Sequence, residues 1–253
     1  MISRIKFDQV EEGLLFCQEA YANLVGTPTS LYSVGIDLEL THMYLQSNVD
    51  THGKKNKFEL PLSKAFRAEE ECNKIITDEQ NYILAKVQVN IGKVYLAQRA
   101  VADKEKAAGL LDKAELLFKQ ALGMIAILYT DEHPLAAKYN QNLVESMNAR
   151  PESNERTQTL TNLCEKNYQI AKNYFGENSI YLLRVLYTRY TAALHEETSE
   201  SSDSAMTQMA SIVHEGEPVR ANQFLYKAIL LDTIMMMNSG SETAGARIEM
   251  QLS

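Results

Sequence analysis

Histidine and cysteine, the residue types that most often build catalytic or metal sites, are not spaced for chemistry in this chain. The histidines are His42, His52, His133, His195 and His214. The cysteines are Cys17, Cys72 and Cys164. No His-Glu-x-x-His zinc motif occurs, and the cysteines are too few and too far apart for a metal knuckle or a disulfide framework. We therefore expect no metal site, and we expect buried free thiols, as in a reducing compartment.

Motifs for nucleophilic catalysis and phosphate binding are also missing. The sequence contains neither Gly-x-Ser-x-Gly nor Gly-x-Gly-x-x-Gly. The segment Gly53-Lys54-Lys55 lacks the earlier glycine and the following hydroxyl residue of a P-loop. We interpret it as a solvated basic loop, with a site for an acidic partner as the alternative. We therefore predict no catalytic residue and no cofactor, and a protein that is not an enzyme.

Composition and charge narrow the class of partner and compartment. A hydrophobic fraction of 45% is enough for a sizeable core, and the net charge of −8 opposes binding to phosphate backbones. No apolar run approaches the roughly 20 residues needed to cross a bilayer. The N-terminus lacks the apolar core of a signal peptide. We expect a cytoplasmic protein without nucleic-acid or membrane partners; cytoskeletal association and organelle import stay open.

The elements that would position any site are helices. There are only 5 Pro and 11 Gly, strict alternation of apolar and polar residues is rare, and prolines precede or open amphipathic runs. Apolar spacing predicts about ten helices, over residues 7–25, 29–47, 62–77, 80–99, 107–129, 134–148, 154–175, 179–195, 203–214 and 218–238. We expect a mobile tail over 239–253. Polar Ser199–Ser204 is interpreted as a flexible linker, with a phosphorylation site as the alternative.

One predicted hairpin carries a recognisable repeat pattern between Ala85 and Leu122. Its first helix contains Ile91-Gly92-Lys93-Val94-Tyr95, and its second contains Ala114, Phe118, Ala121 and Leu122. This pattern resembles the tetratricopeptide repeat. The small residues would let two helices approach closely, and the aromatic residues would fill the space between hairpins. Because about ten residues are inserted between Tyr95 and Ala114, we expect an extended turn over Ala102–Gly109.

A second motif begins at His133-Pro134 and resembles the kinesin-light-chain type of this repeat. Ala137, Asn142 and Leu143 match that type, whereas Gln141 replaces an asparagine. The resemblance is specific around residues 85–147 and 165–190. It implies an all-α fold, a right-handed α-solenoid of about five hairpins over residues 1–238. Residues 7–24 resemble the second half of a hairpin that lacks its first half, which favours assembly into a larger complex.

The resemblance also implies a binding surface, because the first helix of each hairpin lines the concave face in this family. The residues that the register places there are Lys86, Val89, Lys93, Lys138, Gln141, Asn142, Glu145, Leu183, Leu186, Tyr187 and Tyr190. Asn142 is the preferred contact, because an amide both donates to and accepts from a peptide backbone. For each residue, an ordinary packing or solvated position is the alternative. The family's clamp for a C-terminal carboxylate is not expected, since Val89 and Leu183 replace polar clamp residues.

These features predict a non-catalytic scaffold or adaptor subunit that binds protein segments in its groove or at its ends. The alternative is a helical regulatory or substrate-recruiting region associated with an enzyme. The partners would be other proteins, as peptide segments or helices, within a multiprotein complex.

Overall fold

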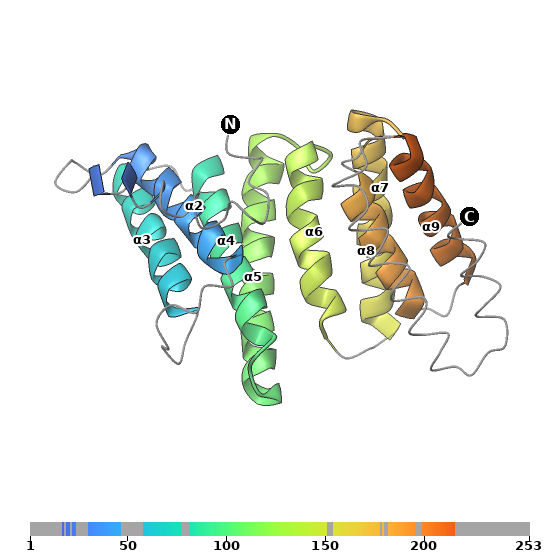
Figure 1. Cartoon of the computed structure of the whole chain (residues 1–253), viewed down its shortest axis with the longest axis horizontal. Helices are drawn as coiled ribbons and strands as arrows, with labels where there is room; N and C mark the ends of the chain where they lie inside the picture. Colours follow the sequence, from blue (N-terminus) through green and yellow to red (C-terminus); the bar gives the residue numbers. More distant parts are fainter. Residues whose placement is uncertain are drawn as a thin grey trace. The chain divides into compact units, whose positions relative to one another are not determined.

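The chain is helical throughout the part that the structure describes. The computed structural model describes residues 17, 19–20, 22–23, 30–46, 58–76, 81–150, 154–177, 179, 182–195 and 199–215. Within these residues there are eight helices and no strand (Figure 1). The helices are α2 Leu31–Gln46, α3 Glu59–Ile75, α4 Tyr82–Arg99, α5 Lys104–Leu128, α6 Pro134–Asn148, α7 Asn154–Phe175, α8 Leu182–His195 and α9 Ser199–Glu215. The predicted all-α class is therefore confirmed.

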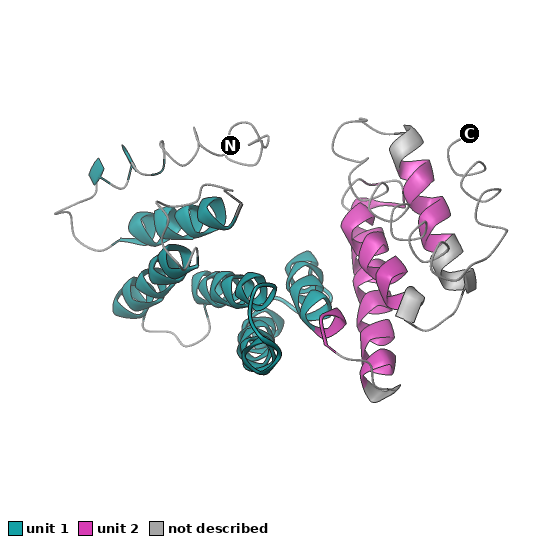
Figure 2. Cartoon of the chain, turned by 60° about the horizontal axis from the view of Figure 1, so that its bottom comes forward, with its two compact units in different colours: residues 1–146 teal, residues 147–253 magenta. Residues whose placement is uncertain are grey.

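Two compact units divide the chain, residues 1–146 and residues 147–253 (Figure 2). Unit 1 contains α2 to α5 and most of α6, and unit 2 contains α7 to α9. The helix predicted over 218–238 and the tail over 239–253 lie outside the described residues, as does nearly all of the helix predicted over 7–25. A continuous solenoid over 1–238 stays a prediction.

Local sequence signals account for where the helices begin and end. The side chain of Asn81 accepts a hydrogen bond from the Ile83 amide at the start of α4, at 2.7 Å. Asp103 does the same for Lys106 at the start of α5, at 2.9 Å. Both side chains satisfy N–H groups that have no partner inside the helix. Pro134 is the first residue of α6, and Gly176, with φ of +84°, follows the end of α7 in a conformation that favours glycine.

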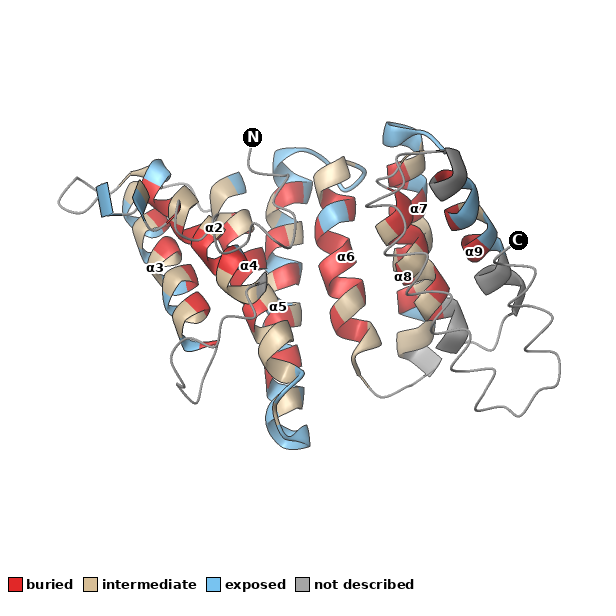
Figure 3. Ribbon diagram, in the orientation of Figure 1, coloured by how far each residue is buried: buried red, intermediate tan, exposed pale blue. Residues whose placement is uncertain are grey.

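Unit 1 is built from helices that pack in chain order. α2 contacts α3 and also α4, α3 contacts α4, and α4 contacts α5. The buried cluster joining α2, α3 and α4 contains Val34, Leu38, Ala65, Ala68, Cys72, Val87 and Ile91. Figure 3 marks the buried residues of these helices in red on the ribbon. The contact between α2 and α4 places two helices that are not consecutive in the chain side by side.

Gly92 is the point of closest approach in the α4–α5 hairpin. A Cβ added to Gly92 would lie 2.5 Å from Cε1 of Phe118, which is fully buried. Ala114 and Ala121 are buried on the same helix as Phe118. The close approach of α4 and α5 at the small residue Gly92 agrees with the prediction, whereas Phe118, which was expected between hairpins, packs against Gly92 within this hairpin.

Two predicted loops are instead the first turns of helices. α5 begins at Lys104, so most of the turn expected over Ala102–Gly109 is helix, and the inserted residues lengthen the hairpin. α9 begins at Ser199, so the linker expected over Ser199–Ser204 is also helical. In both cases the opening turns are polar, and acidic or hydroxyl residues, such as Asp103 and Glu105 at α5 and Ser199 and Glu200 at α9, are favoured at the N-terminal end of a helix. Apolar periodicity does not reveal such turns.

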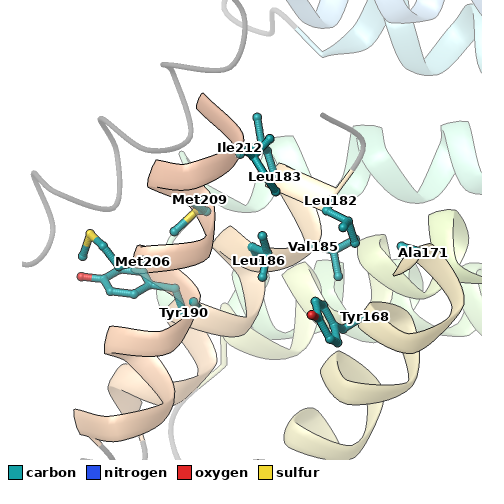
Figure 4. Packing of buried hydrophobic residues seen from close by; sticks show 11 residues of the cluster. Tyr168, Ala171, Leu182, Leu183, Val185, Leu186, Tyr190, Met206, Met209 and Ile212 are labelled. Atoms are coloured by element: carbon teal, nitrogen blue, oxygen red, sulfur yellow. The ribbon is translucent and has the colours of Figure 1, made fainter. Parts of the chain in front are cut away.

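Unit 2 has its own core, in which α8 contacts both α7 and α9. Its buried cluster contains Tyr168, Ala171, Leu182, Leu183, Val185, Leu186, Tyr190, Ala205, Met206, Met209 and Ile212 (Figure 4). A helix that is covered on two sides needs apolar residues on both. This explains why Leu182, Leu183, Val185, Leu186 and Tyr190 of α8 are all buried, with Arg184 and Arg189 on the part of the helix that is less covered.

Candidate functional site

The structure divides the predicted groove residues into a buried and an accessible set. The buried set, in which no residue is more than 3% exposed, comprises Val89, Gln141, Asn142, Leu183, Leu186 and Tyr190. The accessible set comprises Lys86, Lys93, Lys138, Glu145 and Tyr187. The buried residues are packing residues in this structure, which corrects their placement on an open surface. The alternative weighed for each of them, an ordinary packing position, is the one observed.

The physical reason for this correction is clearest in unit 2. Leu183, Leu186 and Tyr190 belong to the core cluster in which α8 lies against α7 and α9. A repeat register identifies which side of a helix faces a given direction, but it does not show whether another helix covers that side. Tyr187 packs partly buried against the same cluster.

Three lysines of the accessible set come together in unit 1 around His42. Lys86 and Lys93 lie on α4, Lys138 lies on α6, and His42 lies on α2. All three lysines act electrostatically on the His42 imidazole. Lys86 and Lys93 are two helical turns apart and therefore share one side of α4. We refer to His42, Lys86, Lys93 and Lys138 as the basic patch.

The surroundings of His42 disfavour a positive charge on its imidazole. His42 keeps an exposed area, yet the surrounding protein displaces enough water to lower the pKa of its imidazole. Lys93, Lys138 and Lys86 lower this pKa further, and Glu39 raises it. A neutral imidazole among three ammonium groups is the state that minimises repulsion. The sequence did not single out His42, because the three lysines that act on it lie on other helices.

Two asparagines repeat the same local arrangement beside the patch. Asn90 follows Lys86 by four residues, and its Nδ2 donates to the Lys86 carbonyl oxygen at 2.8 Å. Asn142 follows Lys138 by four residues, and its Nδ2 donates to the Lys138 carbonyl oxygen at 3.1 Å. The Oδ1 of Asn142 is buried without a hydrogen-bond partner among the described residues. A buried acceptor left unsatisfied costs about 1–3 kcal/mol, and because this oxygen is not accessible it belongs to the interior rather than to the surface of the patch.

A second polar cluster, which the sequence analysis missed, joins α2 to α3. The Asp37 side chain is fully buried and accepts two hydrogen bonds from Arg67, with 2.6 Å between Nε and Oδ2. Ser33 donates to Glu71 at 2.5 Å, and Glu71 also lies near Arg67. The available signal was an aspartate inside the apolar run Gly35-Ile36-Asp37-Leu38. Because Asp37 is inaccessible, we assign this cluster to stability rather than binding.

The buried carboxylate gives unit 1 a distinct response to pH. Burial raises the pKa of Asp37 to about 7, while Lys64 lowers it and Glu71 raises it. The native state therefore binds a proton between this pKa and that of the unfolded chain, near 4, where the unfolded state does not. In that interval the contribution of Asp37 to the free energy of unfolding increases as the pH falls.

We expect the Asp37→Asn variant to lose this pH dependence. Urea unfolding of both proteins at pH 8 and pH 5 measures the effect as the difference between their two stability changes. Wild type should gain more stability than Asp37→Asn on going to pH 5. Equal changes in the two proteins would show that Asp37 does not take up a proton in this interval.

Metal-binding clusters and membrane-spanning helices are both absent from the part of the chain that the structure describes. No group of three or more His, Cys, Asp or Glu residues there is placed to hold a metal ion. None of the helices described above is long and apolar enough to cross a membrane. Cys17, Cys72 and Cys164 are buried free thiols, as expected.

Comparison with known proteins does not place the chain in a family. No protein-family model matches the sequence. No curated protein matches it either. The resemblance to tetratricopeptide repeats therefore rests on the motifs around Gly92 and Asn142 and stays a prediction.

Proposed function

We propose that this chain is a non-catalytic scaffold or adaptor subunit that binds a protein segment along α2, α4 and α6. The observation that carries this proposal is the basic patch, in which lysines of α4 and α6 lie within electrostatic range of His42 on α2 and keep accessible side chains. Alternate helices of stacked hairpins share one face of the stack, and extended ligands bind along such faces. A right-handed solenoid in the manner of tetratricopeptide repeats is part of the proposal.

Two packing observations support the stacking. α2 contacts α4 directly as well as through α3, as expected if the first helices of successive hairpins are neighbours. The close contact between Gly92 and Phe118 allows α4 and α5 to form one tight hairpin. Both packing contacts are compatible with a protein that has no catalytic centre. In this packing His42, Lys86, Lys93 and Lys138 keep accessible side chains.

Charge reversal of the patch is expected to remove the partner. In the triple variant Lys86→Glu, Lys93→Glu, Lys138→Glu, the surface would repel the ligand that wild type attracts. The matched control is Lys104→Glu, Lys106→Glu, Lys119→Glu, which changes the net charge equally at exposed positions of α5. Affinity purification of the tagged full chain, followed by quantitative mass spectrometry, should show stoichiometric partners with wild type and the control but not with the patch variant.

Three outcomes of this experiment separate the hypotheses. Identical partners for all three baits would show that the patch is not the binding surface. A single stoichiometric enzyme lost only with the patch variant would favour the alternative function, a region that regulates an enzyme or recruits its substrate. Several non-enzymatic subunits lost together would support the scaffold.

A further inference from the structure

We infer that the partner of the basic patch is an acidic segment of another protein, which presents carboxylates to Lys86, Lys93 and Lys138. This inference rests on the proposed function, because it specifies the ligand of the same surface. It goes further because it names the chemical class of the ligand, the spacing of the ligand's carboxylates, and the uptake of a proton by His42 on binding.

The charges around the patch indicate that the ligand is acidic. The whole chain has a net charge of −8, yet three lysines gather around His42 with Glu39 as the acidic residue acting on the imidazole. In the described part of the chain, no carboxylate pairs with Lys86 or Lys138. Like charges held near one another repel, and carboxylates from a ligand would relieve that repulsion. A local excess of positive charge in an acidic protein therefore favours an acidic ligand.

Helix geometry sets the spacing of the ligand's charges. Lys86 and Lys93 are seven residues apart on α4, which corresponds to about 10.5 Å along the helix axis. An extended peptide rises by about 3.3 Å per residue and presents every second side chain on the same side. Carboxylates separated by two or four positions can therefore reach both lysines. A segment with alternating acidic residues meets this requirement.

The distribution of charge favours a protein segment over a nucleic acid. A nucleic acid carries a phosphate at every nucleotide and would extend beyond the three lysines onto a chain of net charge −8, which repels it. An acidic segment of a protein can confine its carboxylates to the patch. Asn142, one turn beyond Lys138 on α6, is 2% exposed and its Oδ1 is buried, so we do not assign it a ligand contact.

His42 couples binding to the uptake of a proton. The charged groups that act on it are Glu39 on α2, Lys86 and Lys93 on α4, and Lys138 on α6. Ligand carboxylates would oppose the lysines and raise the pKa of the imidazole, which the lysines lower in the free protein. Because the complex then binds the proton more tightly than the free protein does, affinity should increase as the pH falls from 8 toward 6.

The test uses the full chain and three defined probes. These are a capped peptide of alternating Glu and Ser, the same peptide with Gln in place of Glu, and an oligothymidylate of similar charge. Fluorescence anisotropy measures binding, and NMR titration measures the pKa of His42, whose signal is assigned with His42→Asn. We expect the Glu peptide to bind about 10-fold or more tightly than the Gln peptide, to raise the pKa of His42, and to bind more weakly at high salt.

The variants show whether binding occurs at the patch. The triple variant Lys86→Glu, Lys93→Glu, Lys138→Glu should weaken binding of the Glu peptide by about 10-fold or more, whereas the α5 control should leave it unchanged. Equal binding of the Glu and Gln peptides, an unchanged pKa of His42, or tighter binding of the oligothymidylate would overturn the inference.

This experiment and the affinity purification fail independently. If the patch variant loses its cellular partners but the Glu peptide does not bind to wild type, the scaffold stands and the class of ligand is wrong. If the patch variant keeps its partners, the proposed binding surface is wrong, whatever the peptides do.

Discussion

Replacing Phe118 with alanine is expected to lower the free energy of unfolding of unit 1 by about 3–5 kcal/mol. Phe118 is fully buried on α5, and its ring lies against Gly92 of α4, with Ala114 and Ala121 buried on either side of it in the sequence. Its removal would leave a cavity at the centre of the hairpin, because the flanking residues are too small to fill the space. Urea unfolding followed by circular dichroism measures the loss.

A paired substitution tests whether the contact between Gly92 and Phe118 is the cause. Gly92→Ala alone should destabilise by about 1–2 kcal/mol, because the added Cβ would lie 2.5 Å from a ring that cannot move away. In a Phe118→Leu background the same change should cost less or become stabilising, since alanine favours helix over glycine by about 1 kcal/mol. Additive effects of the two substitutions would contradict the close approach. Gly109→Ala is the control, because nothing lies within 4 Å of its added Cβ.

Much of the helical fold could be predicted because local signals agree with it. The bounds of α6 and α7 match the predicted ranges 134–148 and 154–175, where Pro134 and the glycine after Phe175 mark helix ends. The starts of α5 and α9 were missed because their first turns are polar. Asp103 was a usable signal for α5, since aspartate is favoured as an N-cap.

The candidate site was only partly predictable from the sequence. The repeat register chose Lys86, Lys93 and Lys138, and the structure brings all three to His42 in unit 1. The register also chose Val89, which is buried, because periodicity along one helix cannot show where a second helix covers it. The role of His42 depends on neighbours that are at least 44 residues away in the chain, so no local pattern could identify it.

The basic patch and the Asp37 cluster illustrate two uses of charge on the same helix. Asp37 is fully buried, and its partner Arg67 comes from α3, so this pair fixes one helix against the next. His42 lies five residues further along α2 and keeps an exposed area, with the lysines that act on it on α4 and α6. Substitutions at Asp37 should therefore change stability, whereas substitutions of the patch lysines should change binding.

We expect the Asp37→Ala variant to lose about 3 kcal/mol of stability, which is the lower end of the range for breaking a buried ion pair. The low end applies because Arg67 keeps 27% of its side chain exposed, so water can partly solvate its guanidinium group once the Asp37 carboxylate has been removed. Asp37→Asn should lose less, because an amide oxygen still accepts from Arg67 and the volume is filled. Urea unfolding of each variant at pH 8, above the Asp37 pKa of about 7, provides the comparison.

A double-mutant cycle with Arg67→Ala separates the ion pair from the loss of packing. If the pair is the cause, Asp37→Ala and Arg67→Ala together should cost less than the sum of the single changes, with a coupling of about 0.5–3 kcal/mol. The control is Glu70→Ala, which breaks the exposed ion pair to Lys74 on the same helix as Arg67 and should change stability little. A loss at Asp37 as small as that at Glu70, or strict additivity with Arg67→Ala, would show that α2 and α3 are joined by their apolar contacts alone. Val34 and Leu38 of α2, with Ala65 and Ala68 of α3, would then be the residues to substitute.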